Sequence, residues 1–147
     1  VAVAKEINTL GYSGHAQGFA GDVCSEAGIS NLISAVTLHT DTLNILMNNA
    51  GRTWGAPLGN FPYDAWEKVM SLNVTGMFHL SQCLSNMLAA SGSADDPSRI
   101  VNVGSVMGEV PMGDGAYSYA VSKSGVHHMT RILAKEWANG HITVIAL

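Results

Sequence analysis

The sequence predicts one α/β domain over residues 1–147, built on a doubly wound parallel sheet. Short apolar runs of strand length alternate with amphipathic stretches that are long enough to be crossover helices. The apolar runs show no strict alternation with polar residues, as is typical of strands that are buried on both faces. The 147 residues, 47% of them hydrophobic, are enough for one core, and no repeat, low-complexity tract or linker divides them.

The first part of the chain predicts a helix, a strand and a second helix. Val1 to Leu10 has the pattern of the end of a helix, closed by Gly11. A short strand is expected over residues 16–20. A helix follows over residues 25–39, where apolar residues recur at helical spacing, at Ile29, Leu32, Ile33 and Val36.

The second part predicts two more strand–helix units and a closing strand. Residues 43–47 form an apolar run of strand length that ends at Asn48. Asp64 with Glu67 resembles a capping box, which opens a long helix over residues 64–90. After a polar loop, the remaining elements are a buried strand, a helix and a closing strand, over residues 99–103, 116–138 and 142–145.

Composition excludes several classes of function. A net charge of −4 with only 7 Lys and Arg residues leaves no basic cluster to neutralise phosphates, so no nucleic-acid partner is expected. No apolar run approaches the ~20 residues that span a bilayer, so no membrane segment is expected. Cys24 and Cys83 lack metal-ligand spacing. We therefore expect a cytoplasmic protein with reduced thiols and no metal.

The candidate functional residues follow the predicted strands. Asp22 follows the first strand, Asn48 to Gly51 the second and Ser105 the third, while Tyr119 and Lys123 lie on the helix after Ser105. Ligands of open α/β sheets bind outside the carboxyl ends of the strands. The sequence therefore predicts a binding site at this edge of the sheet.

Tyr119 and Lys123 have the spacing of a proton-transfer pair. Residues four apart on a helix lie on one face, where an ammonium favours the phenolate form of a nearby tyrosine. Tyr119 would then act as a general acid for a carbonyl, or as a general base for an alcohol, near neutral pH. Taken alone, the same spacing is more typical of a surface pair.

Four motifs together resemble the short-chain dehydrogenase/reductase family. They are Asn48-Asn49-Ala50-Gly51, Asn73 within Leu72-Asn73-Val74, Gly104-Ser105, and Tyr119 with Lys123. Within that family, three stretches resemble the 3-oxoacyl-carrier-protein reductases linked to rhamnolipid synthesis, at residues 49–56, 66–70 and 96–99. The implied activity is hydride transfer between NADP(H) and a carbonyl or secondary alcohol, possibly in a 3-oxoacyl thioester.

The resemblance implies a catalytic role for four residues. Ser105 would hydrogen-bond the substrate carbonyl and stabilise the developing oxyanion. Tyr119 would donate the proton. Lys123 would lower the pKa of that tyrosine and bind the nicotinamide ribose. Asn73 would hold a water that completes a proton relay.

The resemblance also implies cofactor contacts. Asp22 and Val23 would flank the adenine, and Asn48, Ala50 and Gly51 would lie along the cofactor. Of the two cofactors, NADP(H) is favoured over NAD(H). The residues that choose between them belong to a glycine-rich strand–turn–helix unit, and no such fingerprint occurs in these residues.

Simpler interpretations stand beside some of these roles. Asn48 to Gly51 also has the composition of a turn, and Asp22 that of a helix N-cap. Asn73 alone would be a polar residue tolerated in a helix. His127 and His128 are expected as core or subunit-interface residues, and Tyr117 as a packing residue.

The start and end of the chain predict a piece of something longer. The chain begins inside a helix and ends inside a strand, so we expect that the first βα unit and the C-terminal part are missing. Two hypotheses follow. The chain is most of the catalytic core of a carbonyl reductase, whose helices 64–90 and 116–138 form a homo-oligomer contact. Alternatively, it is a truncated, catalytically silent form that at most associates with full-length subunits through those helices.

Overall fold

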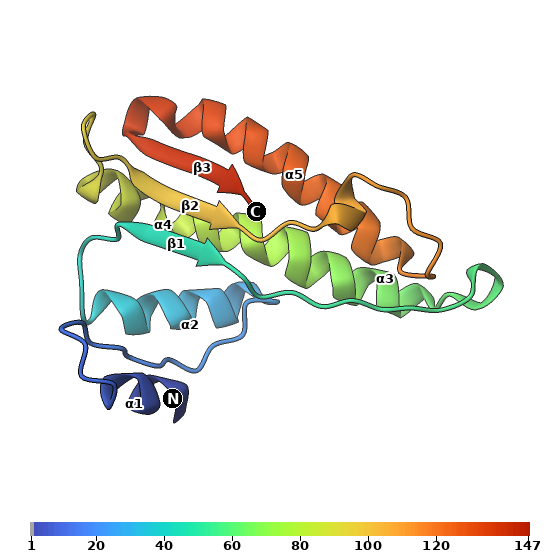
Figure 1. Ribbon diagram of the computed structural model, residues 1–147, viewed down its shortest axis with the longest axis horizontal. Coiled ribbons are helices and arrows are strands. Elements are labelled where there is room, and N and C mark those ends of the chain that lie inside the picture. Colours follow the sequence, from blue (N-terminus) through green and yellow to red (C-terminus); the bar gives the residue numbers. More distant parts are fainter. Residues whose placement is uncertain (1) are drawn as a thin grey trace.

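The computed structural model describes residues 2–147, and its centre is a parallel sheet of three strands in the order β1-β2-β3 (Figure 1). Met47 of β1 pairs with Val101 of β2, which in turn pairs with Ile145 of β3. The strands are β1 (Ile45–Asn48), β2 (Ser98–Asn102) and β3 (Ile142–Ala146). The helices are α1 (Ala2–Asn8), α2 (Glu26–Thr37), α3 (Tyr63–Met70), α4 (Met77–Ser91) and α5 (Tyr117–Trp137). The predicted α/β class with a parallel sheet is confirmed.

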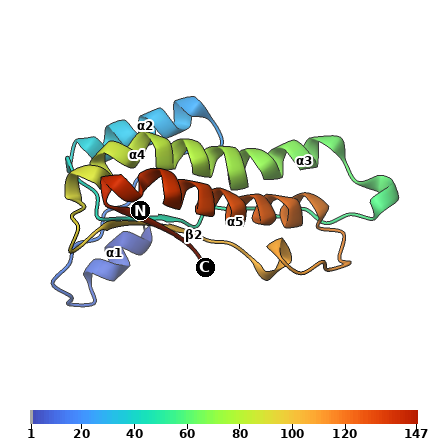
Figure 2. The same cartoon turned by 90° about the horizontal axis from the view of Figure 1, so that it is seen from above.

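Helices cover one face of the sheet. α2, α3 with α4, and α5 lie on one side, whereas α1 lies on the other (Figure 2). The inward row of the sheet is Leu46, Ile100 and Val144, which are at most 9% exposed. It packs against leucines of α4 and α5, at positions 84, 88 and 133. Apolar burial between the sheet and these helices is therefore the main stabilising contribution.

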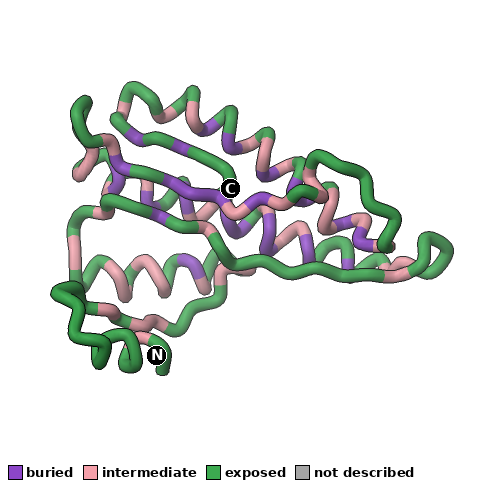
Figure 3. Tube along the Cα trace, in the orientation of Figure 1, coloured by how far each residue is buried: buried purple, intermediate pink, exposed green. Residues whose placement is uncertain are grey.

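The opposite face of the sheet stays open, although the sequence predicts strands covered on both faces. Met47 is 55% exposed and Ile145 43%, while Val101 between them is shielded by its neighbours. Figure 3 shows the same contrast: β2 is buried along most of its length, whereas most residues of β1 and β3 are not buried.

α3 and α4 are continuous through a π-helical segment, η2 (Ser71–Gly76). The predicted capping box at Asp64 is wrong. Pro62 is the N-cap, and Asp64 lies within the first turn, where it pairs with Lys68 at 2.6 Å. An i,i+4 partner on the helix therefore takes the carboxylate that a capping box would use.

The N-terminal part departs most from the prediction. Residues 16–20, all within the described part of the chain, form no strand. The ladder of the sheet stops at β1, so this segment has no neighbouring strand with which to form backbone hydrogen bonds. Its Ala16 instead exchanges two hydrogen bonds with the side chain of Asn8 on α1. Gly11 follows α1 with a φ of +76°, the left-handed conformation predicted for a helix stop.

Candidate active site

Tyr119 and Lys123 share one face of α5. The Lys123 ammonium lies 5.6 Å from the centroid of the Tyr119 ring and donates a 2.6 Å hydrogen bond to the carbonyl of Val103, just after β2. Lys123 is only 6% exposed, and this burial lowers its pKa. The carbonyl that follows β2 thus holds the Lys123 ammonium beside the Tyr119 ring.

Asn73 joins the loop after β1 to α5. Its Oδ1 accepts from the backbone N–H of Arg52, and its Nδ2 donates to the Arg52 carbonyl and to Ser122 Oγ, each at 2.9 Å. Ser122 Oγ in turn donates to the Tyr119 carbonyl at 2.7 Å. Asn73 is 3% exposed and lies in the π-helical segment η2, a helix distortion that is frequent at functional sites.

Gly51 lies where the loop after β1 passes Asn73 and Lys123. A Cβ at this position would be 3.5 Å from Asn73 Oδ1 and 3.9 Å from Lys123 Nζ. Gly51, Asn73, Tyr119 and Lys123 are therefore brought together, although up to 72 positions (123 − 51) separate them along the chain.

Ser105 is presented at the carboxyl end of β2. Its Oγ accepts a 3.2 Å hydrogen bond from the backbone N–H of Met107, because Ser105 caps the short helix η3 (Val106–Gly108). A hydroxyl that accepts in this way still has its own proton to donate. Ser105 is half-buried, so that proton is available to a bound carbonyl.

Asn48 faces the helices and belongs to a polar chain that the sequence did not predict. Its Nδ2 donates to Ser81 Oγ of α4 at 2.9 Å and to Asn102 Oδ1 of β2 at 2.8 Å. Asn102 Nδ2 donates to Thr130 Oγ1 of α5 at 2.9 Å. This polar chain could have been predicted from the positions of Asn48 and Asn102, which each lie at or near the end of a predicted strand. A side chain that faces the helices at such a position needs a hydrogen-bond partner.

Asp22 and Val23 are held at the start of α2, apart from Tyr119. The backbone N–H of Cys24 and the hydroxyl of Ser25 donate to the Asp22 carboxylate, both at 2.9 Å, and lower the pKa of this exposed group. Ser25, not Asp22, is the N-cap of α2. The Val23 carbonyl lies against Gly76 at the end of η2, and Ala50 is exposed in the loop after β1.

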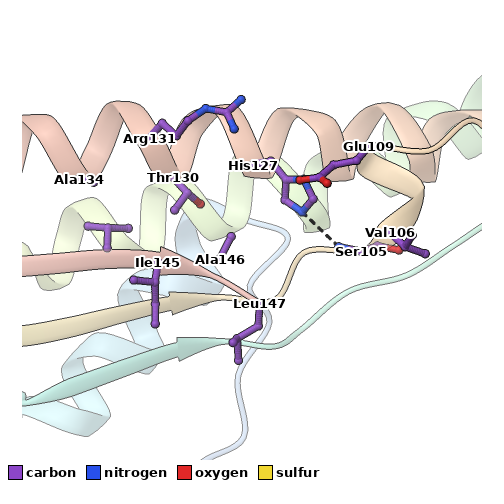
Figure 4. A pocket seen from close by; sticks show the side chains of 11 residues that line it. Ser105, Val106, Glu109, His127, Thr130, Arg131, Ala134, Ile145, Ala146 and Leu147 are labelled. Carbon is purple, nitrogen blue, oxygen red and sulfur yellow. Dashed lines mark hydrogen bonds and ion pairs between the residues drawn. The ribbon is translucent and has the colours of Figure 1, made fainter.

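A cavity of about 620 Å³ lies between α5, the end of β3 and Ser105 (Figure 4). His127, predicted as a core or interface residue, lines it with a side chain that is 14% exposed. Its Nε2 lies 3.4 Å from the backbone nitrogen of Ser105. Tyr117 is a packing residue as predicted, edge-to-face with Phe61 at 5.7 Å.

Metal-ligand clusters and membrane-spanning helices are both absent from residues 2–147. No group of three or more His, Cys, Asp or Glu side chains in this range has the geometry to hold a metal ion. No helix in the same range is long and apolar enough to cross a bilayer. Cys24 and Cys83 are free thiols.

Comparison with known proteins gives a consistent family. The short chain dehydrogenase family model matches residues 1–147. A rhamnolipid-biosynthesis 3-oxoacyl-[acyl-carrier-protein] reductase of Pseudomonas aeruginosa is 44% identical over 143 residues, which are 97% of this chain and 56% of that protein. The 3-oxoacyl-[acyl-carrier-protein] reductase FabG of Vibrio cholerae is 34% identical over 87% of this chain and 50% of its own.

Solved structures agree with this assignment. The RhlG/NADP active-site complex of Pseudomonas aeruginosa superposes with a TM-score of 0.93 at 42% identity, over 99% of this chain and 56% of that one. A gluconate 5-dehydrogenase of Burkholderia cenocepacia with NADP and tartrate gives 0.84 at 27% identity, over 99% and 54%. The chain thus spans about half the length of the relatives it matches. It belongs to the short-chain dehydrogenase/reductase family.

Proposed function

We propose that this chain carries the proton-transfer and carbonyl-binding part of an NADP(H)-dependent carbonyl reductase. The observation that carries the proposal is the Lys123 ammonium, buried and held 5.6 Å from the Tyr119 ring. Burial of a charge costs stability, so a buried lysine beside a tyrosine is a candidate functional residue. Family membership supplies the reaction class, since the chemistry is set by the site and not by the fold.

The residues around Lys123 fit the sugar end of a nicotinamide cofactor. An ammonium has three donors, and the one hydrogen bond that its Nζ makes within residues 2–147 is to Val103. The other donors are free for ribose hydroxyls. The backbone at Gly51 passes close to Lys123 and Asn73. Preference for NADP(H) over NAD(H) is supported by the RhlG complex, which contains NADP.

In this proposal the hydride that adds to the carbonyl carbon is supplied by the nicotinamide of bound NADPH. Tyr119 donates its phenolic proton to the carbonyl oxygen, so that the product is a neutral secondary alcohol. Lys123 stabilises the phenolate that remains on Tyr119. Ser105 donates its hydroxyl proton in a hydrogen bond to the same carbonyl oxygen and stabilises the developing negative charge.

Asn73 and the end of the π-helical segment hold this arrangement in place. Asn73 fixes Arg52 and Ser122, and Ser122 fixes the first turn of α5 at the Tyr119 carbonyl. In the proposed proton relay, this polar cluster is where a water would bridge Lys123 to solvent. Asp22 and Val23 stand at the adenine end, with an exposed carboxylate that suits an amine donor.

The substrate class is proposed as a 3-oxoacyl thioester or a related ketone. It is supported by the printed activity of the Pseudomonas aeruginosa relative at 44% identity. Other relatives act on sugar acids by name, such as the Escherichia coli 2-dehydro-3-deoxy-D-gluconate 5-dehydrogenase at 33%. A test of the substrate therefore compares both classes.

The test measures NADPH oxidation with a 3-oxoacyl thioester and with 5-keto-gluconate. It uses the 147-residue chain and the same chain joined to the flanking segments of the Pseudomonas relative. We expect turnover of the thioester by the joined chain, and its loss in Tyr119→Phe with NADPH binding retained. A joined chain that binds NADPH but reduces neither ketone would overturn the proposal.

A second candidate is a silent chain that associates with longer subunits through α3 with α4 and α5. The supporting observation is apolar exposure on these helices, with Trp66 at 39%, Phe78 at 37%, Val121 at 48% and Ile132 at 48%. Exposed apolar residues on helix faces are typical of interaction surfaces. Co-expression of a tagged joined chain with the 147-residue chain tests this candidate. Co-purification that is lost on Val121→Glu and Ile132→Glu would support it.

A further inference from the structure

His127 stands directly behind the residue proposed to bind the carbonyl. Its Nε2 lies 3.4 Å from the backbone nitrogen of Ser105, on the cavity side of α5 (Figure 4). We propose that His127 is a positioning residue for Ser105. In this role its Nε2 accepts the Ser105 backbone N–H, and its ring fixes the turn that presents the serine hydroxyl.

The geometry requires one protonation state of the ring. An Nε2 that accepts a hydrogen bond is unprotonated, so the proton of a neutral imidazole is on Nδ1. The Glu109 carboxylate lies 3.4 Å from Nδ1, which is an ion-pair distance without the alignment of a hydrogen bond. A carboxylate on this side favours the proton at Nδ1. Glu109 therefore favours the form of His127 whose Nε2 accepts the Ser105 N–H.

The turn is shaped around the histidine ring. A Cβ added to Gly104 would collide with His127 Nε2 and would also meet the Leu147 carbonyl at 2.9 Å. The Gly104 N–H donates to that carbonyl at 2.7 Å. Thus Leu147, directly after β3, holds the residue before Ser105, and His127 of α5 holds Ser105 itself. The hydroxyl is then the free end of a turn that is fixed on two sides.

The functional consequence rests on the proposed reductase activity. A displacement of about 1 Å at a group that binds the reacting atoms is enough to lower a rate by ~10²-fold. The Ser105 hydroxyl is oriented by only one other contact among the described residues, the N–H of Met107 at 3.2 Å. Without His127, the turn would hold the hydroxyl less accurately, and kcat would fall while cofactor binding stayed the same.

The first test is independent of activity. Long-range ¹⁵N–¹H correlation of the histidine rings, on the chain joined to its flanking segments, reports which nitrogen of His127 is protonated. We expect an unprotonated Nε2 at neutral pH, and a downfield Ser105 amide proton that moves upfield in His127→Leu. A protonated Nε2, in either the neutral ring or the imidazolium, would overturn the proposal whatever the enzyme does.

The second test compares kinetics across matched variants. His127→Leu keeps apolar volume but removes the acceptor, and His127→Gln restores an acceptor. His128→Leu alters the exposed neighbour on the same helix. We expect roughly ten-fold lower kcat in His127→Leu with unchanged KM for NADPH, partial recovery in His127→Gln, and wild-type values in His128→Leu. If His127→Leu keeps the wild-type kcat, or if Leu and Gln lose activity equally, His127 only fills space.

The outcomes separate the two proposals. If the wild-type chain reduces no ketone but Nε2 accepts from Ser105, the reductase proposal fails and the positioning contact stands. If the wild type turns over and the His127 variants behave like His128→Leu, the positioning proposal alone fails. Thermal melting of every variant shows whether a lost rate reflects lost fold.

Discussion

At the scale of single residues, the site is dominated by one buried cation. Lys123 is 6% exposed and has a single hydrogen-bond acceptor, the Val103 carbonyl, within the described residues. Burial disfavours the charged form and lowers the pKa of the ammonium. The lysine that we propose to assist proton transfer at Tyr119 therefore destabilises the folded state while it is charged.

That cost has a defined pH dependence. Because the folded-state pKa of Lys123 lies below the usual 10.5, the unfolded state binds more protons between the two values. The free energy of unfolding therefore rises with pH in that window, as the folded lysine loses its charge. We expect wild type to gain stability relative to Lys123→Met as the pH rises towards 10.5 in urea titrations.

The control for this prediction is Lys135→Met, which removes an exposed charge in the last turn of the same helix. The wild-type advantage over this variant is expected to stay nearly constant with pH. Equal slopes for Lys123→Met and Lys135→Met would show that burial does not disfavour the Lys123 charge.

At the scale of elements, a chain of hydrogen bonds through residues of β1 and β2 connects α4 with α5. The chain of side chains runs from Ser81 through Asn48 and Asn102 to Thr130, and Asn102 is fully buried. These bonds lie at the carboxyl ends of β1 and β2, next to the loops that carry Gly51 and Ser105. They fix the spacing of α4 and α5. The positions of Asn73, just before α4, and of Tyr119, on α5, depend on that spacing.

Removing the middle of this chain is expected to be costly. Asn102→Ala leaves the Asn48 amide with one partner fewer and creates a small cavity, for a loss of about 2–3 kcal/mol in the free energy of unfolding. Urea denaturation measures the change. Thr143→Ala on the exposed side of neighbouring β3 is the control, with an expected change below about 1 kcal/mol. Equal losses would show that the amide contacts add nothing.

The π-helical segment makes a second prediction about elements. A Cβ on Gly76 would collide with the backbone carbonyl of Val23, whereas one on Gly125 of α5 has no atom nearer than 3.9 Å. Gly125→Ala is expected to stabilise the protein by about 0.5–1 kcal/mol, because alanine is the better helix former. Gly76→Ala is expected to destabilise it and, if Asp22 and Val23 contact the cofactor as proposed, to weaken NADPH binding.

Thermal melting and NADPH titration of the two glycine variants are sufficient to test this. If both substitutions stabilise, the segment with Val23 does not lie against η2 as described. If only Gly76→Ala loses affinity for NADPH, the start of α2 takes part in cofactor binding.

At the scale of the whole molecule, the open face of the sheet is the main uncovered apolar surface. Met47, Val101 and Ile145 form one row across the three strands, and the outer two are 55% and 43% exposed. β1 and β3 also end the described ladder, which leaves their outer edges unpaired within it. Exposed apolar faces and strand edges favour association between molecules.

We therefore expect the 147-residue chain to self-associate. The double variant Met47→Thr with Ile145→Thr replaces apolar surface with a residue that still suits strands, and should shift the chain towards monomer. Size-exclusion chromatography with light scattering gives the mass. Leu38→Thr, at an 83% exposed position after α2, is the matched control and should change nothing. A monomeric wild-type chain, or an equal effect of both variants, would contradict the expectation.

The sequence by itself determined the type and order of most elements, the placing of Asn48 and Ser105 at or after the ends of strands, and that of Tyr119 on the helix that follows. These follow from apolar periodicity and local chemistry, which a short window of sequence contains. The motifs were enough to identify the family, and the α5 spacing was enough to put Lys123 beside Tyr119.

Tertiary structure alone decided which partners the polar side chains have. Asn48 meets Asn102 from 54 positions away, and His127 reaches Ser105 from 22. It also decided that residues 16–20 form no strand, because a strand exists only beside another strand. Local sequence records the need of a buried amide for a partner, but the identity of that partner depends on how distant segments pack.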